Sequence, residues 1–255
     1  MNILFIGDIF ATPGLRVTKQ FLETHKDNYD FIIANGENAS GGFGLTKKHF
    51  KQIISAGVDV VTLGNHSWDQ RETLELVEES SKLIRPINYP RTSPGLGFGN
   101  FMTRSGDYIT VIQAQGRIFM EPLDCPFSAI DSVLESIPDA QAIVVDFHAE
   151  ATSEKKVMGY HLKSRVSAVL GTHTHVQTAD EMIMGSTAYI TDVGMTGVQE
   201  SSIGMRFAEV HKRFVNKIPA RYKPADEAAT LCAVEMRIEQ GKAKTINRIQ
   251  WRAEL

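Results

Sequence analysis

The chain has few of the residues and segments that mark several classes of protein. Cysteine occurs only at Cys125 and Cys232, outside any Cys-x-x-Cys spacing, which argues against a disulfide framework and a thiolate metal site. No apolar run approaches the roughly 18 residues of a membrane span. The opening MNILFIGD has no basic stretch and no small-residue cleavage site, so we interpret it as a strand rather than a signal peptide. These absences favour a cytoplasmic protein with no membrane partner.

An excess of charge of one sign is also missing. The 27 Lys and Arg residues nearly balance the 30 Asp and Glu residues, and the formal net charge is −3. Such a field gathers neither nucleic acid nor an anionic membrane surface, so we expect no strong nucleic-acid surface and a local site for any anionic substrate. The length of 255 residues predicts a single domain over residues 1–255. Homo-oligomer formation is left open.

Short apolar runs alternate with amphipathic stretches along the chain. The helical signals are a stretch after Pro13, one from a Thr46 cap to a Gly57 stop, one opened by an Asp69-x-x-Glu72 capping box, and two near 127–137 and 153–164. Two further segments alternate as hairpins around 105–107 and 240–241. Strands buried on both faces are predicted for residues 2–8, 30–35, 58–65, 108–114, 142–148 and 166–173. We therefore predict an α/β fold, a four-layer α-β-β-α sandwich of two mixed sheets flanked by helices.

Residues with metal-binding side chains follow five of these predicted strands. Because the carboxyl ends of parallel strands share one edge of a sheet, we expect them to converge in space. Carboxylates, carboxamides and imidazoles together suit Fe, Mn or Zn better than Mg or Ca. The set is too large for one ion, whereas two ions bridged by a carboxylate and a hydroxide would use most of it in phosphoester hydrolysis. The residues are Asp8, Glu37, Asn38, Asn65, His66, His148, His173 and His175.

Each of these elements also has an ordinary structural interpretation. Asp8 alone is typical of a turn or a helix cap, and Gly64-Asn65-His66 is compatible with a tight turn. The rings of His173 and His175 would point to one face of a strand with period two, yet they could still form a surface pair. Their joint occurrence at successive strand ends is what favours a metal site.

Taken in order, the motifs resemble those of the calcineurin-like metallophosphoesterases over roughly residues 2–195. They are GD at 7–8, GEN at 36–38, GNH at 64–66, His148 and GTHTH at 171–175. The strings FIGDIF, TLGNHSWD, DFHAEATSEK and GTHTHVQTAD are similar to the YmdB-like branch, bacterial phosphodiesterases associated with 2′,3′-cyclic nucleotides. The chain departs from the wider family at two positions. Ile9-Phe10 follow Asp8 where the family has Asp-x-His, and Glu37 replaces the bridging Asp.

This resemblance implies a dinuclear phosphodiesterase that acts on a small-molecule phosphodiester, a cyclic nucleotide such as 2′,3′-cAMP. Its cofactors would be two divalent transition-metal ions, Fe or Mn ahead of Zn. A metal-bridging hydroxide would attack phosphorus, and His66, free of metal, would act as general acid toward the departing ribose oxygen. The first metal would be held by Asp8, Glu37, Asn38 and His175, and the second by Glu37, Asn65, His148 and His173.

Further residues are candidates for supporting roles around this site. Arg117, Arg85 and the loop with Gly41 and Gly42 are candidates for the substrate rim, although the glycines could simply serve a turn. Glu150 and Asp180 are candidates to orient metal-binding imidazoles, with a plain surface role as the alternative.

Two other functions stay open at this point. A phosphomonoesterase or 5′-nucleotidase would use the same metals, since nothing in the motifs recognises the second ester. A metal-bound regulatory protein with little turnover would explain the missing histidine of the first motif. His66, which metal binding alone does not need, favours the enzyme. A Rossmann dinucleotide binder is excluded, because GDIFATPG after the first strand lacks Gly-x-Gly-x-x-Gly.

Overall fold

The computed structural model describes residues 1–252, and within them the chain forms two stacked sheets. The strands of the first sheet are β1 (Asn2–Ile6), β2 (Phe31–Asn35), β3 (Val60–Thr62), β4 (Leu83–Ile84), β11 (Thr230–Glu239) and β12 (Lys242–Arg252). Those of the second are β5 (Phe98–Met102), β6 (Tyr108–Gln115), β7 (Ile143–His148), β8 (Ala168–Thr172), β9 (Met182–Met184) and β10 (Thr187–Ile190).

Both sheets combine parallel and antiparallel strands. The first has the order β12-β11-β1-β2-β3-β4, in which β1 to β4 are parallel and β11 and β12 are antiparallel. The second has the order β5-β6-β7-β8-β10-β9, with antiparallel strands β5 and β9 at its edges. The two predicted hairpins are confirmed as β5-β6 and β11-β12. Gln240 and Gly241 both have positive φ, which suits a tight turn between twisted strands.

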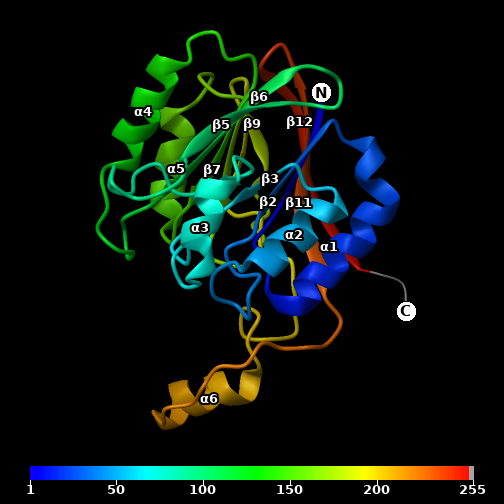
Figure 1. Ribbon diagram of the computed structural model, residues 1–255, viewed down its shortest axis with the longest axis vertical. Coiled ribbons are helices and arrows are strands. Elements are labelled where there is room, and N and C mark those ends of the chain that lie inside the picture. The colour runs from blue at the N-terminus through cyan, green and yellow to red at the C-terminus, as the bar shows by residue number, and fades with distance from the viewer. Residues whose placement is uncertain (253–255) are drawn as a thin grey trace.

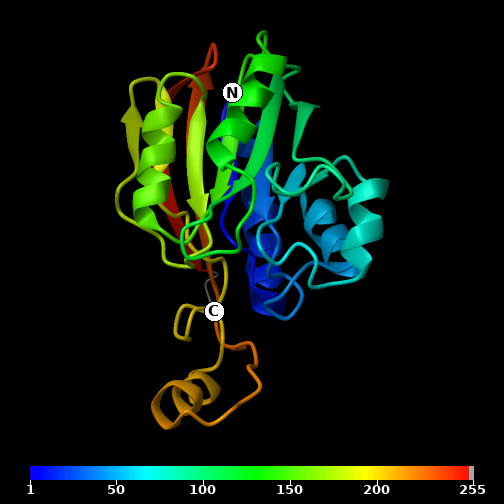
Figure 2. The ribbon, with the colours of Figure 1, turned by 90° about the vertical axis from the view of Figure 1, so that its left-hand side faces the viewer.

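Helices cover the outer face of each sheet, which completes the predicted four layers (Figures 1 and 2). The first sheet is covered by α1 (Ala11–His25), α2 (Lys47–Ala56) and α3 (Glu72–Glu79), and a 3₁₀ turn (Lys26–Asn28) follows α1. The second is covered by α4 (Pro126–Ser136) and α5 (Thr152–His161). The helix α6 (Phe207–Asn216) stands apart from both layers (Figures 1 and 2). No helix among the described residues is both long and apolar enough to span a bilayer.

The central strands are apolar on both faces because each face is buried. Leu4 and Ile6 of β1 pack toward the helices of the first sheet. Ile3 and Phe5 point the other way and join the core between the sheets, where they meet residues such as Val144 of β7. This double burial explains why the sequence shows continuous apolar runs there instead of alternation.

The predicted ends of α2 are confirmed, whereas the predicted start of α3 is wrong. Thr46 accepts a hydrogen bond from the His49 backbone, and Gly57 closes the helix with φ 117°. Helix α3 begins only at Glu72, and Arg71 occupies its cap position. Asp69 does not cap this helix, because its carboxylate binds the His66 ring instead.

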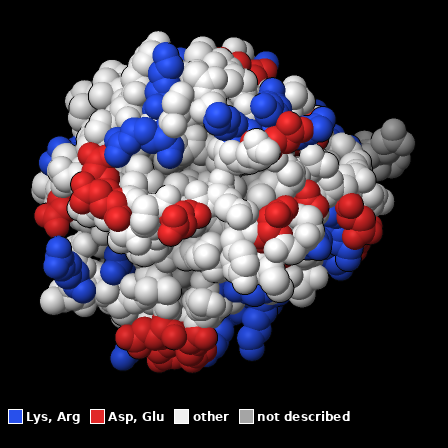
Figure 3. Space-filling model, turned by 90° about the horizontal axis from the view of Figure 1, so that it is seen from above, with Lys and Arg blue, Asp and Glu red and all other residues white. Residues whose placement is uncertain are grey.

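A projecting segment was not predicted from the sequence. We call residues 199–228, which include α6, the arm. Figures 1 and 2 show it extending from the end of the molecule toward which the parallel strands run. Figure 3 shows the other end of the molecule, where Lys and Arg are interspersed with Asp and Glu.

Candidate metal centre and active site

The predicted site residues all lie at the carboxyl ends of the parallel strands, on the seam between the two sheets. The first sheet supplies Asp8, Glu37, Asn38, Asn65 and His66 from the loops after β1, β2 and β3. The second supplies His148 at the end of β7, and His173 and His175 after β8. Each sheet therefore carries about half of the site, and only their stacking completes it.

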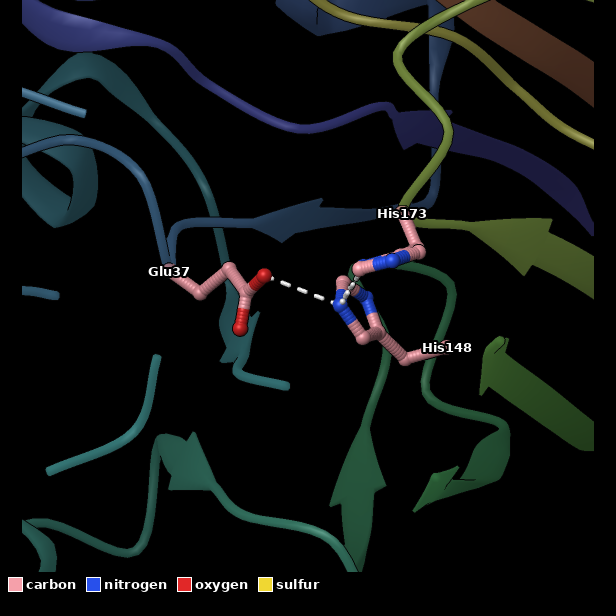
Figure 4. Close-up of side chains that lie close together, drawn as sticks. All are labelled: Glu37, His148 and His173. Carbon is pink, nitrogen blue, oxygen red and sulfur yellow. Dashed lines mark hydrogen bonds and ion pairs between the residues drawn. The ribbon is translucent and has the colours of Figure 1, made fainter. Parts of the chain in front are cut away.

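The tightest group of these side chains joins Glu37, His148 and His173 (Figure 4). His148 Nε2 lies 2.9 Å from Glu37 Oε1 and 3.1 Å from His173 Nδ1. Asn65 Oδ1 also lies 2.9 Å from His148 Nε2. Gly64 permits this approach, because a Cβ there would lie 2.4 Å from Glu37 Oε2 and 2.5 Å from the His148 ring.

A second pair of donors lies beside this group. His175 Nε2 and Asn38 Oδ1 are 3.3 Å apart. The Asn38 amide nitrogen donates to the Gly42 carbonyl at 2.9 Å, which orients Oδ1 toward the histidine. His175 Nδ1 lies 3.0 Å from the Ile203 carbonyl, an acceptor, and Nε2 is the nitrogen that faces Asn38. An imidazole nitrogen and an amide oxygen that face each other could both bind the same cation.

Asp8 provides a further test of whether a metal fits here. Its side chain is fully buried, and within residues 1–252 its Oδ1 atom has no hydrogen-bond partner. Its Oδ2 atom accepts only a long bond, 3.3 Å, from the His173 backbone. Burial raises the pKa of Asp8 against the opposing charges of His175 and His148. A buried carboxylate oxygen without a donor is costly, and a divalent cation would satisfy it.

The electrostatics of the group favour positive charge next to Glu37. Burial would raise the pKa of Glu37, but the charge and hydrogen bond of His148 outweigh it and lower that pKa to about 2. Burial would lower the pKa of His148, but Glu37, Asp8 and Asp146 raise it to about 9. Burial and the neighbouring His148 lower the pKa of His173 to about 3. Glu37 is thus held as an anion and His173 as a neutral imidazole, the forms that bind metal, whereas His148 would have to release a proton to a cation that takes its place beside Glu37.

His173 and His175 reach the site by a different route from the one that the sequence suggested. Strand β8 ends at Thr172, so the two-residue period of a strand does not orient the rings. Both histidines instead have positive φ, 103° and 65°, a strained conformation for residues with a side chain. The Thr174 backbone N–H and hydroxyl both donate to Asp192 Oδ2, at 3.0 and 2.8 Å, and hold the turn.

Asp192 is in turn paired with a buried lysine. Lys155 Nζ of α5 lies 2.6 Å from Asp192 Oδ2, and both side chains are almost completely buried. Asp192 Oδ1 accepts from the Gly194 backbone at 2.8 Å. Sequence analysis missed this pair, since a lysine in an amphipathic helix gives no signal of burial.

A buried carboxylate also connects the two sheets directly behind the candidate metal ligands. Asp146 of β7 accepts hydrogen bonds from Thr62 of β3 at 2.6 Å and from Asn35 of β2 at 3.2 Å, across the seam. It also accepts from the Thr172 hydroxyl at 2.7 Å. The Thr172 hydroxyl proton is donated to Asp146, so the hydroxyl oxygen can only accept from His148 Nδ1, 2.9 Å away. The other ring nitrogen of His148, Nε2, therefore faces the site. Burial raises the pKa of Asp146 to about 6, despite the opposing His148 charge and hydrogen bonds.

His66 is the one predicted site residue whose ring stands outside the donor groups. Its Nδ1 lies 2.7 Å from Asp69 Oδ2, and its backbone N–H donates to Glu37 Oε2 at 2.9 Å. The rings of Phe43 and His66 form a T-shaped contact with their centroids 5.1 Å apart. Asp69 was interpreted as a helix cap from the sequence, and the His66-x-x-Asp69 spacing was the signal that could have paired it with the histidine.

The structure separates the candidates for the substrate rim. Gly42 lines a cavity of about 370 Å³ together with Glu37, His66 and the two ligand histidines of the GTHTH turn. Gly41 lies on the same loop but is not among the residues that line this cavity. Arg117 lines a different cavity with Glu154. Arg85 is buried and donates to the carbonyls of its own loop.

The two proposed supporting carboxylates also differ. Glu150 Oε2 lies 3.0 Å from His173 Nε2, as the sequence suggested for an orienting residue. Asp180 contacts no ligand histidine among the described residues and binds Lys156, Thr178 and Thr191 instead.

The comparisons with known proteins agree with this geometry. The YmdB-like protein family matches residues 4–249. The 2′,3′-cyclic-nucleotide 2′-phosphodiesterase of Bacillus subtilis is 43% identical over 250 residues, which cover 96% of this chain and 94% of that protein. A hypothetical protein from Thermus thermophilus is 44% identical with a TM-score of 0.95, and both chains are fully covered. A phosphatase from Mycoplasma pneumoniae is 30% identical with a TM-score of 0.93, covering 99% of this chain and 93% of that one.

Two stacked sheets with donor side chains gathered at their seam define a calcineurin-like metallophosphoesterase, a class whose members use divalent metal ions. Within that class, the chain belongs to the YmdB-like family. This membership makes the protein a hydrolytic enzyme of the phosphodiesterase class.

We expect the buried Lys155–Asp192 pair to be essential for stability. Asp192→Asn leaves a buried lysine without its partner and should lower the free energy of unfolding by about 3–5 kcal/mol. The double variant Lys155→Met/Asp192→Asn should recover part of this loss, because no unpaired charge remains. Lys156→Met is the control, since its half-exposed pair with Asp180 should contribute at most about 1 kcal/mol. Urea unfolding measures all three, and equal small losses would contradict the assignment.

The Asp146–Thr172–His148 chain should control metal affinity. Thr172→Val keeps the shape but removes the acceptor for His148 Nδ1, and affinity should fall about 10- to 100-fold, the usual effect of removing such a partner. Thr172→Ser retains the hydroxyl and should bind metal like the original protein. Competition with a fluorescent chelator gives the dissociation constants. Equal affinities for the Val and Ser variants would rule out this role.

Proposed function

We propose that this protein hydrolyses cyclic phosphodiesters of nucleosides, with 2′,3′-cyclic nucleotides as the substrate class. The observation that carries the proposal is the convergence of seven donor residues on one seam, with His66 beside them and outside the donor groups. The named activity of the Bacillus subtilis relative supports this choice of substrate. Hydrolysis forms one P–O bond from water and breaks one ribose P–O bond, which leaves a phosphomonoester.

The contacts among the donors support two cations, divided as the family resemblance implies. Asn65, His148 and His173 gather on one side of Glu37, and Asn38 and His175 form the other pair. We place Asp8 with this second pair, and Glu37 between the two groups. When bound, divalent cations of the Fe or Mn type neutralise phosphoryl charge and lower the pKa of a water molecule.

His66 is proposed as the general acid for the departing ribose oxygen. Asp69 accepts from Nδ1, so Nε2 is the atom left to deliver a proton. The ring lines the same cavity as Glu37 and His173, which supports a position near a phosphoryl group that these donors would hold. Asp69 holds the orientation of the ring, which is a positioning role.

The two-metal arrangement predicts distinct losses of metal from two variants. Protein purified without chelator should contain about two transition-metal ions per chain, and activity lost in EDTA should return with Mn²⁺ or Fe²⁺. Glu37→Ala should lower occupancy of both positions, because this residue lies between them, whereas Asp8→Ala should mainly empty one. Elemental analysis measures both. Full activity with one ion per chain would refute the two-metal proposal.

The acid role of His66 predicts a loss that depends on the leaving group. His66→Ala removes no ligand, so metal content should be unchanged while kcat on 2′,3′-cyclic AMP falls by roughly 10² to 10⁴. The loss should be smaller on bis-p-nitrophenyl phosphate, since p-nitrophenolate leaves with little need of a proton.

Three outcomes would argue against this assignment. An equal loss on both diesters would exclude the acid role. Turnover of nucleoside monophosphates but of neither diester would favour a phosphomonoesterase. No turnover of any of these compounds by the unmodified, metal-loaded protein would favour a regulatory protein.

A further inference from the structure

The arm forms part of the wall of the metal site. Its Ile203 carbonyl accepts from His175 Nδ1 at 3.0 Å, so the arm directly contacts a proposed ligand. Met205 and Val210 pack with Phe10 of the body in a small apolar cluster. Gly42 makes room for this junction, because a Cβ there would lie 2.7 Å from both Met205 and Phe10. The arm is therefore attached at the catalytic end and shapes what can enter it.

The cavity over the proposed ligands is lined by both polar and apolar side chains. Glu37, His66 and His173 are among the polar ones, and the phosphoryl group would be bound beside them. Phe43 of the body and Phe214 of the arm line the same cavity, and their side chains are 40% and 65% exposed. Exposed aromatic faces of this kind stack well on nucleobases. Because Phe43 touches the His66 ring, a base could stack there while its ribose oxygen faces the histidine.

The charge of the arm differs from that of the rest of the chain. Residues 206–223 contain six Lys and Arg residues and one acidic residue, Glu209. This gives residues 206–223 a local charge of +5. The whole arm, which also contains Glu200, Asp226 and Glu227, carries +2, and the rest of the chain carries −5. None of the six basic side chains forms an ion pair with any residue in 1–252. They are Arg206, Lys212, Arg213, Lys217, Arg221 and Lys223.

These cations alternate with aromatic residues that line the cavity. Arg213 precedes Phe214, and Arg221 and Lys223 flank Tyr222. The Arg213 guanidinium also lies over the Tyr222 ring, 5.0 Å from its centroid. Exposed cations interleaved with aromatic side chains are the pattern that binds single-stranded nucleic acid. The small net charge of the whole protein conceals this segment.

We propose that the arm binds single-stranded RNA whose 3′ end carries the 2′,3′-cyclic phosphate. The proposal rests on the proposed function: the terminal phosphate lies at the metal centre, its base stacks on Phe43 and Phe214, and upstream phosphates contact the arm. Only RNA can supply this end, since the cyclic ester needs a 2′-hydroxyl. The supplying reaction is RNA cleavage in which O2′ bonds to the adjacent phosphorus, the P–O5′ bond breaks, and O5′ takes up a proton.

The first test compares a short oligoribonucleotide ending in 2′,3′-cyclic phosphate with 2′,3′-cyclic AMP. The metal-loaded protein should have a KM for the oligonucleotide at least about 10-fold lower. With three phosphate contacts, raising the salt from 50 to 200 mM should weaken oligonucleotide binding roughly 10- to 20-fold. The triple variant Lys212→Gln/Arg221→Gln/Lys223→Gln should abolish most of the preference. The control Lys82→Gln/Lys242→Gln/Lys244→Gln removes the same charge from exposed side chains outside the arm and should retain it.

The second test measures binding without turnover. Fluorescence anisotropy with the labelled oligoribonucleotide is recorded on the metal-loaded protein and again after chelation. Phe214→Ala should weaken binding roughly 5- to 100-fold, the range for loss of one stacked base. Phe207→Ala is the matched control, because Phe207 is 68% exposed on the same helix and does not line the cavity.

Failure of the arm proposal can be distinguished from failure of the proposed function. Equal KM values for the two substrates, or equal effects of the two triple variants, would overturn RNA binding by the arm while leaving the phosphodiesterase intact. Equally tight binding of a deoxyoligonucleotide of the same length would reduce the arm to a general polyanion surface and also overturn the proposal. No turnover of either substrate would refute the proposed function, and the anisotropy experiment would still decide whether the arm binds RNA.

Discussion

Burial of two carboxylates at the seam between two sheets is the constraint on which this structure depends. Asp8 and Glu37 are withdrawn from water at the ends of β1 and β2, where their charge is costly without a partner. Imidazoles from the second sheet lie against them, and one Asp8 oxygen stays unmatched within the described chain. Burying these two carboxylates lowers the stability of the folded protein, but the same buried oxygens are suited to bind divalent cations. Stability and metal binding are therefore linked, because ligands assembled by folding bind metal only in the folded state.

Two further buried carboxylates hold the ligands in place without belonging to the donor set. Asp146 joins strands of both sheets and sets the tautomer of His148 through Thr172. Asp192 holds the strained turn between His173 and His175 and is neutralised by Lys155. Asp146 holds together the two halves of the site, and Asp192 holds two candidate ligands within one half. Such supporting contacts are what allow a metal site to be built from loops.

The arm gives this fold a surface of different chemistry beside the metal centre. Its apolar residues line the cavity over the proposed ligands. Its exposed cations form no ion pair within the described chain. A polyanion would meet this charge before its reactive end reaches the metals, since electrostatic attraction extends over a Debye length of about 10 Å. If the arm binds RNA as proposed, substrate choice would depend on groups distant from the bond that breaks, a use of remote binding energy in catalysis.

The sequence by itself predicted six of the strands, the two hairpins, the sandwich of two sheets and the seven candidate donor residues, but not β4, β9 or β10. Apolar runs ending at Asp8, Asn65 or His148 have a local physical cause, burial on both faces followed by a polar edge. Only the tertiary structure decided that Asp69 binds His66 instead of capping α3, that Lys155 is buried against Asp192, and that left-handed backbone turns both histidines inward. Likewise, only the structure shows that the arm lines the cavity of the candidate metal centre and that Arg117, a predicted rim residue, lines a different cavity. Each of these depends on contacts between segments far apart in the chain, and periodicity and spacing within one segment carry no information about such contacts.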